Sequence, residues 1–436
     1  MMRSMYAAVS GLRNHQTRMD VIGNNIANVN TIGFKKSRVT FKDAFSQVLK
    51  GASRPQGGLG GTNPMQVGLG MVVGSIDTIH SKGNTQSTGS MTDLAIDGEG
   101  FFILNSGSGS IYYSRAGAFT FDREGNLANP AGLRVQGWYL NEQGERVRSH
   151  YDDTVDPTAA PSNISLIHQL APPKATENVT LSGNLHDGTP GGQTFSRSFT
   201  VYDQKGNGYD VRIEFEPSGN TDEWNWSLPN DDDPANPYVT GTLKFTPEGI
   251  LEEVMLNPGG LWSPEVTDSK VKLTFDPNPD PTVTGDECEQ IFDFSAITQY
   301  ADPRGESVMK VQQDGYTYGK LEEIVVDDKG VISGSYSNGI SRPLLQVALA
   351  TFTNPAGLVG LGNSLYALSN NCGDPEVNPP GMGMAGAVAP SSLEMSNVDL
   401  SEEFTDMIVT QRGFQANSRV ITASDEMLQE LVNIKR

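Results

Sequence analysis

The sequence predicts a mainly β protein whose N- and C-terminal helices pair as a coiled coil, with two or more β-rich domains inserted between them. Apolar residues recur with a helical period near the two ends of the chain, while the middle holds short apolar runs separated by Gly-containing turns. The composition of 48 Gly, 25 Pro and 36% hydrophobic residues suits short strands and many turns. A length of 436 residues exceeds what one hydrophobic core usually serves, so several domains are expected.

The first helix is predicted within residues 1–33. Between Arg3 and Asn28, seam positions advance by alternating steps of four and three, and most of them are apolar. Gln16 and Gly23 interrupt the apolar seam, and several Asn residues lower the helix propensity. The apolar residues that we expect at an interface are Met5, Val9, Leu12, Met19, Ile22 and Ile26.

The last helix is predicted within residues 397–436 and has clear start signals. Asp399 can cap it, and Glu402 follows three residues later, as in a capping box. Its seam also advances by four and three and includes the polar Gln411. The residues expected at an interface are Leu400, Phe404, Met407, Phe414, Ile421 and Leu428.

Two arrangements of these helices are compatible with such narrow apolar seams. Each helix can pack on the globular body of its own chain, as amphipathic helices commonly do. Their separation to opposite ends of a β-rich chain instead favours pairing with each other and with neighbouring subunits. Gln16 and Gln411 support pairing, because polar residues on a seam often set the register of helix assemblies.

Residues 34–93 are predicted to form an extended linker. The stretch 51–92 is rich in Gly, Ser, Thr and Asn, and its glycines lack the spacing and the preceding strand of a phosphate-binding loop. From Leu94 onward the pattern is typical of strands.

Four segments of the middle region each read as a strand, a polar turn that ends in Gly, and a second strand. Gly supplies the positive φ that such a hairpin turn requires, so the Asp and Glu residues beside it are turn formers and not catalytic acids. The four segments are 119–127, 201–206, 244–251 and 325–332.

The composition and the titratable residues argue against several classes of function. A formal net charge of −21 disfavours nucleic acid and anionic membrane as partners. No apolar run is long enough to insert in a membrane, and no cleavable signal peptide is evident. The five His are scattered, and the acidic loop 276–287 has Pro281 where a calcium loop needs Gly. We therefore expect no enzyme activity, cofactor or metal; the roles of Cys288 and Cys372 stay open.

Two long motifs at the ends of the chain resemble signatures of the flagellar rod, hook and hook-associated protein superfamily. One spans 23–36, and the other spans 396–419. Shorter stretches at 97–102, 114–119 and 354–358 resemble the superfamily's shared β-domain. The signature residues that match are Asn24, Asn25, Asn28, Asn30, Gly33, Phe34, Asn397 and Asp399.

The resemblance implies a domain plan and a role. Residues 1–33 with 397–436 would line the inner channel of a tube, and 94–145 with 291–396 would form the shared β-domain. Residues 146–290 would then be an outer, variable β-domain, and this insertion favours a hook protein over a rod protein, which is expected to lack it. A hook protein polymerises into a flexible curved tube that joins rod to filament and transmits torque as a universal joint.

The implied partners are other copies of the chain, rod proteins at the proximal end, the hook cap during assembly, the hook-associated junction protein at the distal end, and the flagellar export apparatus. The expected location is the extracellular flagellum, reached without a cleaved signal peptide. A distal rod protein, a secreted β-rich adhesin and a carbohydrate-active enzyme remain as alternatives.

Overall fold

The computed structural model describes residues 2–52, 54–55, 60–107, 109–149, 152–166, 170–220, 222–229, 237–257, 265–267, 269–275 and 288–434. The chain divides into two compact units. Unit 1 comprises Met1–Ile167, Ile324–Gly334 and Arg342–Arg436, and unit 2 comprises His168–Glu323 and Ser335–Ser341.

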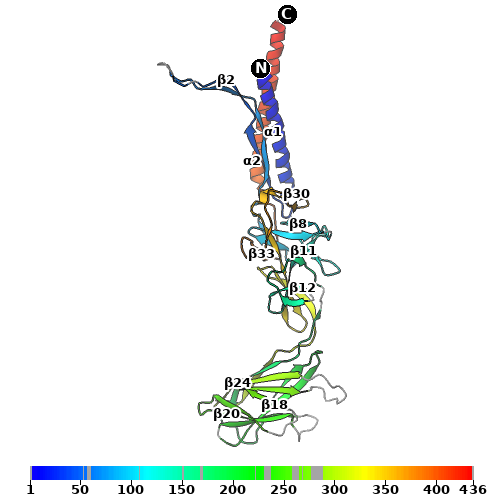
Figure 1. Ribbon diagram of the computed structural model, residues 1–436, viewed down its shortest axis with the longest axis vertical. Helices are drawn as coiled ribbons and strands as arrows, with labels where there is room; N and C mark the ends of the chain where they lie inside the picture. Colours follow the sequence, from blue (N-terminus) through cyan, green and yellow to red (C-terminus); the bar gives the residue numbers. More distant parts are fainter. Residues whose placement is uncertain are drawn as a thin grey trace. The chain divides into compact units, whose positions relative to one another are not determined.

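The terminal helices of unit 1 pack side by side. Helix α1 spans Met2–Ala27 and α2 spans Leu400–Ile434 (Figure 1). They are antiparallel, since the end of α1 meets the start of α2 through Asn25 and Glu403. The predicted fold class is therefore confirmed: the chain is mainly β, and its first and last elements are helices that pair with each other.

The stretch expected to be an extended linker contains strands. Strand β1 (Ser37–Asp43) pairs antiparallel with β4 (Met71–Thr78), and both contact α1. The exposed strands β2 (Ser46–Lys50) and β3 (Met65–Gly68), which lie between β1 and β4 in the sequence, pair with each other. Alternate residues of β4 are half-buried, which is the pattern of a strand with one covered face.

The rest of unit 1 is a β-domain built on β7 (Phe101–Asn105), β8 (Ile111–Ser114), β11 (Arg134–Leu140) and β28 (Ser341–Val347). In this sheet β28, β11, β7 and β8 are successive neighbours. The core includes Phe102, Phe119, Val135 and Leu349. The other elements are β5 (Thr85–Ser87), β6 (Leu94–Asp97), β9 (Thr120–Phe121), β10 (Leu127–Ala128), β12 (Arg146–Ser149), β13 (Asp152–Val155), β14 (Ser162–Asn163), β29 (Leu349–Thr351), η1 (Pro355–Gly357), β30 (Val359–Gly362), β31 (Leu365–Ala367), β32 (Glu376–Asn378), β33 (Ala387–Pro390) and β34 (Ser392–Glu394).

Unit 2 contains two five-stranded sheets. One has the order β22-β23-β24-β16-β25, and the other has the order β17-β18-β19-β20-β21. One core, which includes Phe215, Trp224, Trp226 and Phe292, joins strands of both sheets. The strands are β15 (Leu170–Ala171), β16 (Asn178–His186), β17 (Phe195–Tyr202), β18 (Gly208–Pro217), β19 (Glu223–Leu228), β20 (Val239–Phe245), β21 (Leu251–Leu256), β22 (Glu265–Thr267), β23 (Lys270–Phe275), β24 (Cys288–Tyr300) and β25 (Val308–Gln313). The division between the units falls within β26 (Gly319–Val326) and β27 (Val331–Tyr336), at the first residue of β28, and between 167 and 168.

The four predicted hairpin turns are confirmed. The glycines that end them, Gly125, Gly206, Gly249 and Gly330, all have φ between +66° and +82°. Acidic side chains accept backbone N–H groups inside three of these turns; Asp122 Oδ1, for example, accepts the N–H of Asn126 at 2.8 Å. In the fourth turn the Thr246 hydroxyl accepts the N–H of Ile250. These carboxylates are used in turn formation, as the sequence indicates.

Candidate assembly interface and the ion cluster at its base

The contact between α1 and α2 is made largely by small and polar residues. Thr410 and Ser424 of α2 are buried, and Asn417 lies midway between them. A Cβ on Gly11 of α1 would stand 2.7 Å from Nδ2 of Asn417, and a Cβ on Gly413 would stand 2.8 Å from Nε2 of His15. The absence of a side chain at these two glycines therefore lets the helices approach closely.

Polar pairs fix the register of the two helices. The side chain of Asn25 donates to Glu403 Oε2 at 3.2 Å, and Arg18 Nη2 lies 2.8 Å from Asp406 Oδ2. Glu403 is buried, and this burial raises the pKa of its carboxyl group. Gln16 and Gln411, which the sequence suggested as register residues, are exposed.

The residues predicted at the interface divide into two groups. Those that are buried or half-buried are Met5, Val9, Leu12, Met19, Ile22, Ile26, Met407, Phe414, Ile421 and Leu428. Leu400 and Phe404 are instead 40% and 50% exposed, so α1 does not cover them. The buried residues of α2 are Glu403, Thr410 and Ser424. Glu403 and Thr410 each lie one position before a predicted seam residue, Phe404 and Gln411.

The signature asparagines tie α1 to the chain that follows it. Asn25 donates to the carbonyl of Ser37 at 2.9 Å and accepts the Ser37 N–H at 3.0 Å. Asn28 donates to Asn24 Oδ1 at 2.8 Å, which closes the last turn of the helix. Asn30 is exposed and Phe34 is half-buried.

The C-terminal signature residues organise the start of α2. Asp399 Oδ1 accepts the N–H of Ser401 at 2.8 Å, so Asp399 caps the helix. Asn397 accepts the N–H of Lys36 at 2.7 Å and donates to the carbonyl of Ile79 at 2.9 Å. Glu402 pairs with Lys36 at 2.7 Å.

Beneath the helices lies a cluster of buried charges. Lys35 Nζ is 2.6 Å from Glu394 Oε1, and the side chains of both residues are 0% exposed. Arg115 Nη1 is 3.4 Å from the other carboxylate oxygen, Oε2. Burial lowers the pKa of Lys35 and of Arg115, and their pairing with Glu394 opposes that shift.

His80 borders this ion cluster and packs edge-on against the rings of Phe101 and Tyr366, with centroids 5.6 and 5.3 Å away. Burial, and then the charges of Lys35 and Arg115, lower the pKa of His80 to about 4. Burial also raises the pKa of Tyr366 to about 12. His80 is therefore neutral at pH 7.

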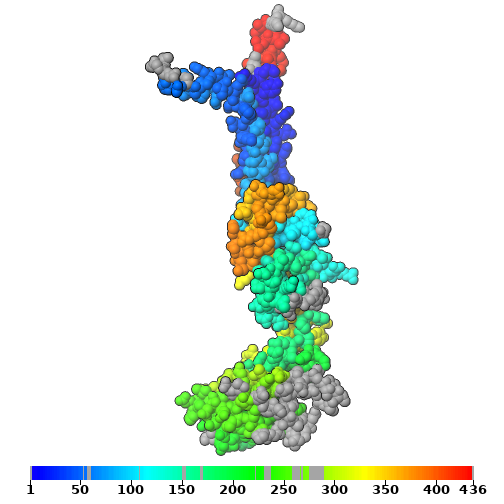
Figure 2. Space-filling view, in the orientation of Figure 1, coloured from blue at the N-terminus to red at the C-terminus, as the bar shows by residue number. Residues whose placement is uncertain are grey.

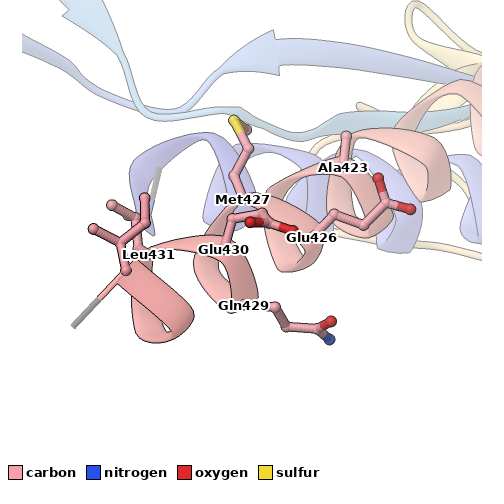
Figure 3. Close-up of a pocket in the computed structure, with 7 residues that line it drawn as sticks. Ala423, Glu426, Met427, Gln429, Glu430 and Leu431 are labelled. Carbon is pink, nitrogen blue, oxygen red and sulfur yellow. The ribbon is translucent and has the colours of Figure 1, made fainter. Parts of the chain in front are cut away.

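The far end of α2 forms an open hollow of about 720 Å³. Figure 3 shows Met427 and Leu431 projecting beside Glu426 and Glu430 on this one helix. The lining residues are Ala423, Glu426, Met427, Gln429, Glu430, Leu431 and Ile434. In the space-filling view of Figure 2 the red end of α2 extends past the blue start of α1.

Comparison with known proteins identifies the family. Four family profiles match: Flagella basal body rod protein at 5–35, Flagellar hook protein FlgE/F/G D1 domain at 95–184, Flagellar basal body protein FlaE D2 domain at 173–316, and Flagellar basal body rod FlgEFG protein C-terminal at 389–434. Over 460 residues, 100% of both chains, the sequence is 44% identical to the flagellar hook protein FlgE of Borreliella burgdorferi.

The chain belongs to the flagellar hook protein family.

Two further relatives of this hook-family chain carry different names, one hook and one rod. It is 38% identical to FlgE of Treponema pallidum and 32% identical to the flagellar basal-body rod protein FlgG of Bacillus subtilis, with 100% of each chain covered. A protein named rod is thus also matched over its whole length.

The ion cluster of this hook-family chain was not singled out by the sequence reasoning. Lys35 and Arg115 fall within motifs that resemble the superfamily, but nothing near Glu394 marks it as their partner. The pairing joins positions 359 residues apart in the chain, so local patterns cannot show it. The one available signal was a Lys and an Arg inside motifs with no acidic residue nearby.

Within the described part of this hook-family chain, no group of three or more His, Cys, Asp or Glu residues is arranged to hold a metal ion. In the same residues, no helix is long and apolar enough to cross a membrane. The acidic loop 276–287 and the side chain of Cys288 lie outside this description, while Cys372 is a buried free thiol.

Proposed function

We propose that this chain is the structural subunit of a bacterial flagellar hook. In this role it polymerises into a flexible curved tube that joins the rod to the filament and transmits torque as a universal joint. The full-length similarity to proteins named flagellar hook protein supports the role.

The observation that carries the proposal is an apolar surface of α2 that its own chain leaves uncovered. Phe404, Ile408 and Val409 are 50%, 58% and 57% exposed, although α1 covers the neighbouring Thr410. The lining residues that the structure describes at the open hollow all belong to the far end of the same helix. Neighbouring copies of the chain would cover both, and each apolar side chain that they bury would contribute about 1.5–3 kcal/mol.

The finer details of the role extend this proposal. Residues 1–33 and 397–436 would line the central channel, and the predicted interface residues would divide between contacts within and between subunits. Rod proteins would meet the proximal end, and the hook cap and the hook-associated junction protein the distal end. The subunit would reach this extracellular site through the flagellar export apparatus.

Electron microscopy of the purified chain under polymerising conditions tests this role. We expect wild-type curved tubes and, for Phe404→Asp, an increase in critical concentration of roughly 10- to 150-fold, because a charge replaces a buried apolar contact. Thr405→Asp adds the same charge to a neighbouring exposed position and serves as the matched control, with tubes close to wild type. Absence of wild-type tubes, or equal behaviour of the two variants, would contradict the proposal.

A rod subunit is the second candidate, favoured by the full-length match to the Bacillus subtilis protein named FlgG. The same micrographs separate the two roles. Straight, inflexible tubes from the wild-type chain would support the rod.

A further inference from the structure

Glu394 occupies a point where four segments of unit 1 meet. It ends β34, six positions before α2 begins. Its backbone carbonyl accepts the N–H of Gly33 at 2.8 Å, and its Oε1 accepts the N–H of Gly83 at 2.9 Å. Through its carboxylate it also pairs with Lys35, after α1, and with Arg115, after β8.

The partners of Glu394 are themselves anchored to the β-domain and to the segment that leads into it. Lys35 Nζ donates to the carbonyl of Ser81 at 2.7 Å, and Arg115 Nη1 donates to the carbonyl of Gly98 at 2.9 Å. The chain leaving α1 and the chain entering α2 are thus held at one place. This arrangement fixes the base of the helical pair.

The charges in this cluster are unequal. One carboxylate lies between two cations, and all three side chains are at most 3% exposed. Removing Lys35 leaves one cation paired with one carboxylate. Removing the Glu394 charge instead leaves two buried cations, with only the exposed Glu99 acting on Arg115. A buried charge without a partner is far more costly than a missing pair.

We propose that Glu394 is the positioning residue that holds the helical pair on the β-domain and sets the stiffness of that joint in the assembled tube. The stiffness part of this inference rests on the proposed hook function. The joint opens only by separating Glu394 from two buried cations, so the cluster resists opening more strongly than a surface ion pair.

Hydrogen exchange of the full-length subunit and the persistence length of its tubes in micrographs test this inference. In Glu394→Gln we expect amide exchange at residues 79–84 and 392–396 to rise roughly a hundredfold, and tubes to be more flexible or absent. Glu402→Gln is the matched control. Glu402 forms a 2.7 Å ion pair with Lys36, but its side chain is 61% exposed. That variant should stay within about threefold of wild type.

A double variant separates charge balance from simple loss of contacts. Lys35→Met combined with Glu394→Gln leaves one buried cation instead of two, so exchange should be slower than in Glu394→Gln alone. Faster exchange in the double variant, or equal exchange in Glu394→Gln and Glu402→Gln, would overturn the inference. Absence of wild-type tubes would count against the hook function, whereas the exchange comparison would still test the anchor.

Discussion

At the scale of single residues, Gly33 shows why the first signature contains a glycine just after the helix. Its φ is +66°, in the left-handed region that side chains disfavour. A Cβ here would lie 2.6 Å from the backbone nitrogen of Ala116. Gly33 therefore lets the chain leaving α1 pass close to the β-domain beside the ion cluster.

Gly33→Ala should destabilise unit 1 by about 1–3 kcal/mol, because both the backbone conformation and the space disfavour a methyl group. Urea unfolding measures the change. Gly23→Ala is the control, since no described atom outside the adjacent helix backbone lies within 4 Å of the place its Cβ would take. That helix-interior change should stabilise by about 0.5–1 kcal/mol, and equal losses in both variants would refute the argument.

His80 predicts a pH dependence of stability. Its pKa is about 4 in the folded protein, against 6.5 ordinarily, so the unfolded chain takes up the proton first as the pH falls. The contribution of His80 is complete above pH 6.5 and is lost progressively toward pH 4. The loss is at most about 3 kcal/mol.

The measurement is the urea midpoint of unit 1 between pH 7 and pH 4, for the wild type and for His80→Gln. The variant should lose less stability between pH 7 and pH 4, because the glutamine at position 80 does not take up a proton. The same slope in both proteins would show that other groups cause the acid sensitivity.

At the scale of elements, apolar periodicity was sufficient to find both helices but not to find their contact line. Apolar periodicity depends on large apolar residues, whereas the helices meet through Gly11, Asn417 and other small or polar side chains. Phe404 was placed on the seam because it is apolar and correctly spaced, yet it is 50% exposed in the single chain. Such a residue fits a contact between subunits, which a rule based on one helix cannot distinguish.

The turns were predictable for a local reason, since a Gly with positive φ and an Asp that accepts turn N–H groups lie within a few residues of each other. The pairing of β1 with β4 was not predictable in this way. Its strands are separated by a Gly-rich stretch, and their covered face is made by α1. Composition alone therefore suggested a linker.

Glu403 predicts the opposite pH dependence for the helical pair. Burial raises the folded pKa of this carboxyl group above its usual 4.5, so the folded state binds the proton more tightly. This contribution to stability is present at acid pH and is lost as the pH rises through the folded pKa. Glu403 thus destabilises the pair at neutral pH.

Glu403→Gln should therefore raise the melting temperature of the helices at pH 7, because a neutral amide can still accept the hydrogen bond from Asn25. Circular dichroism at 222 nm follows the transition. Glu402→Gln, at the exposed neighbour, should change it little. A lower melting temperature in Glu403→Gln would mean that its charge is needed in the pair.

At the scale of the whole molecule, the sequence indicated a β-rich insertion, and the structure places a compact unit from His168 to Glu323, with Ser335–Ser341 added. The expected bounds were 146–290. They differ because β14 pairs with β11 of unit 1, whereas β24 and β25 both pair with β16. The β16–β24 pairing is parallel and joins residues more than one hundred positions apart, so no local pattern indicates it.

Each unit has its own buried core, with Phe215 and Trp226 in unit 2 and Phe102 and Val135 in unit 1. We therefore expect calorimetry of the full chain to show two unfolding transitions. Phe215→Ala removes a ring that is 0% exposed and should lower only the unit 2 transition, by roughly 10 °C. Gly33→Ala should lower only the other transition. If both variants shifted one common transition, the two cores would unfold as a single cooperative body.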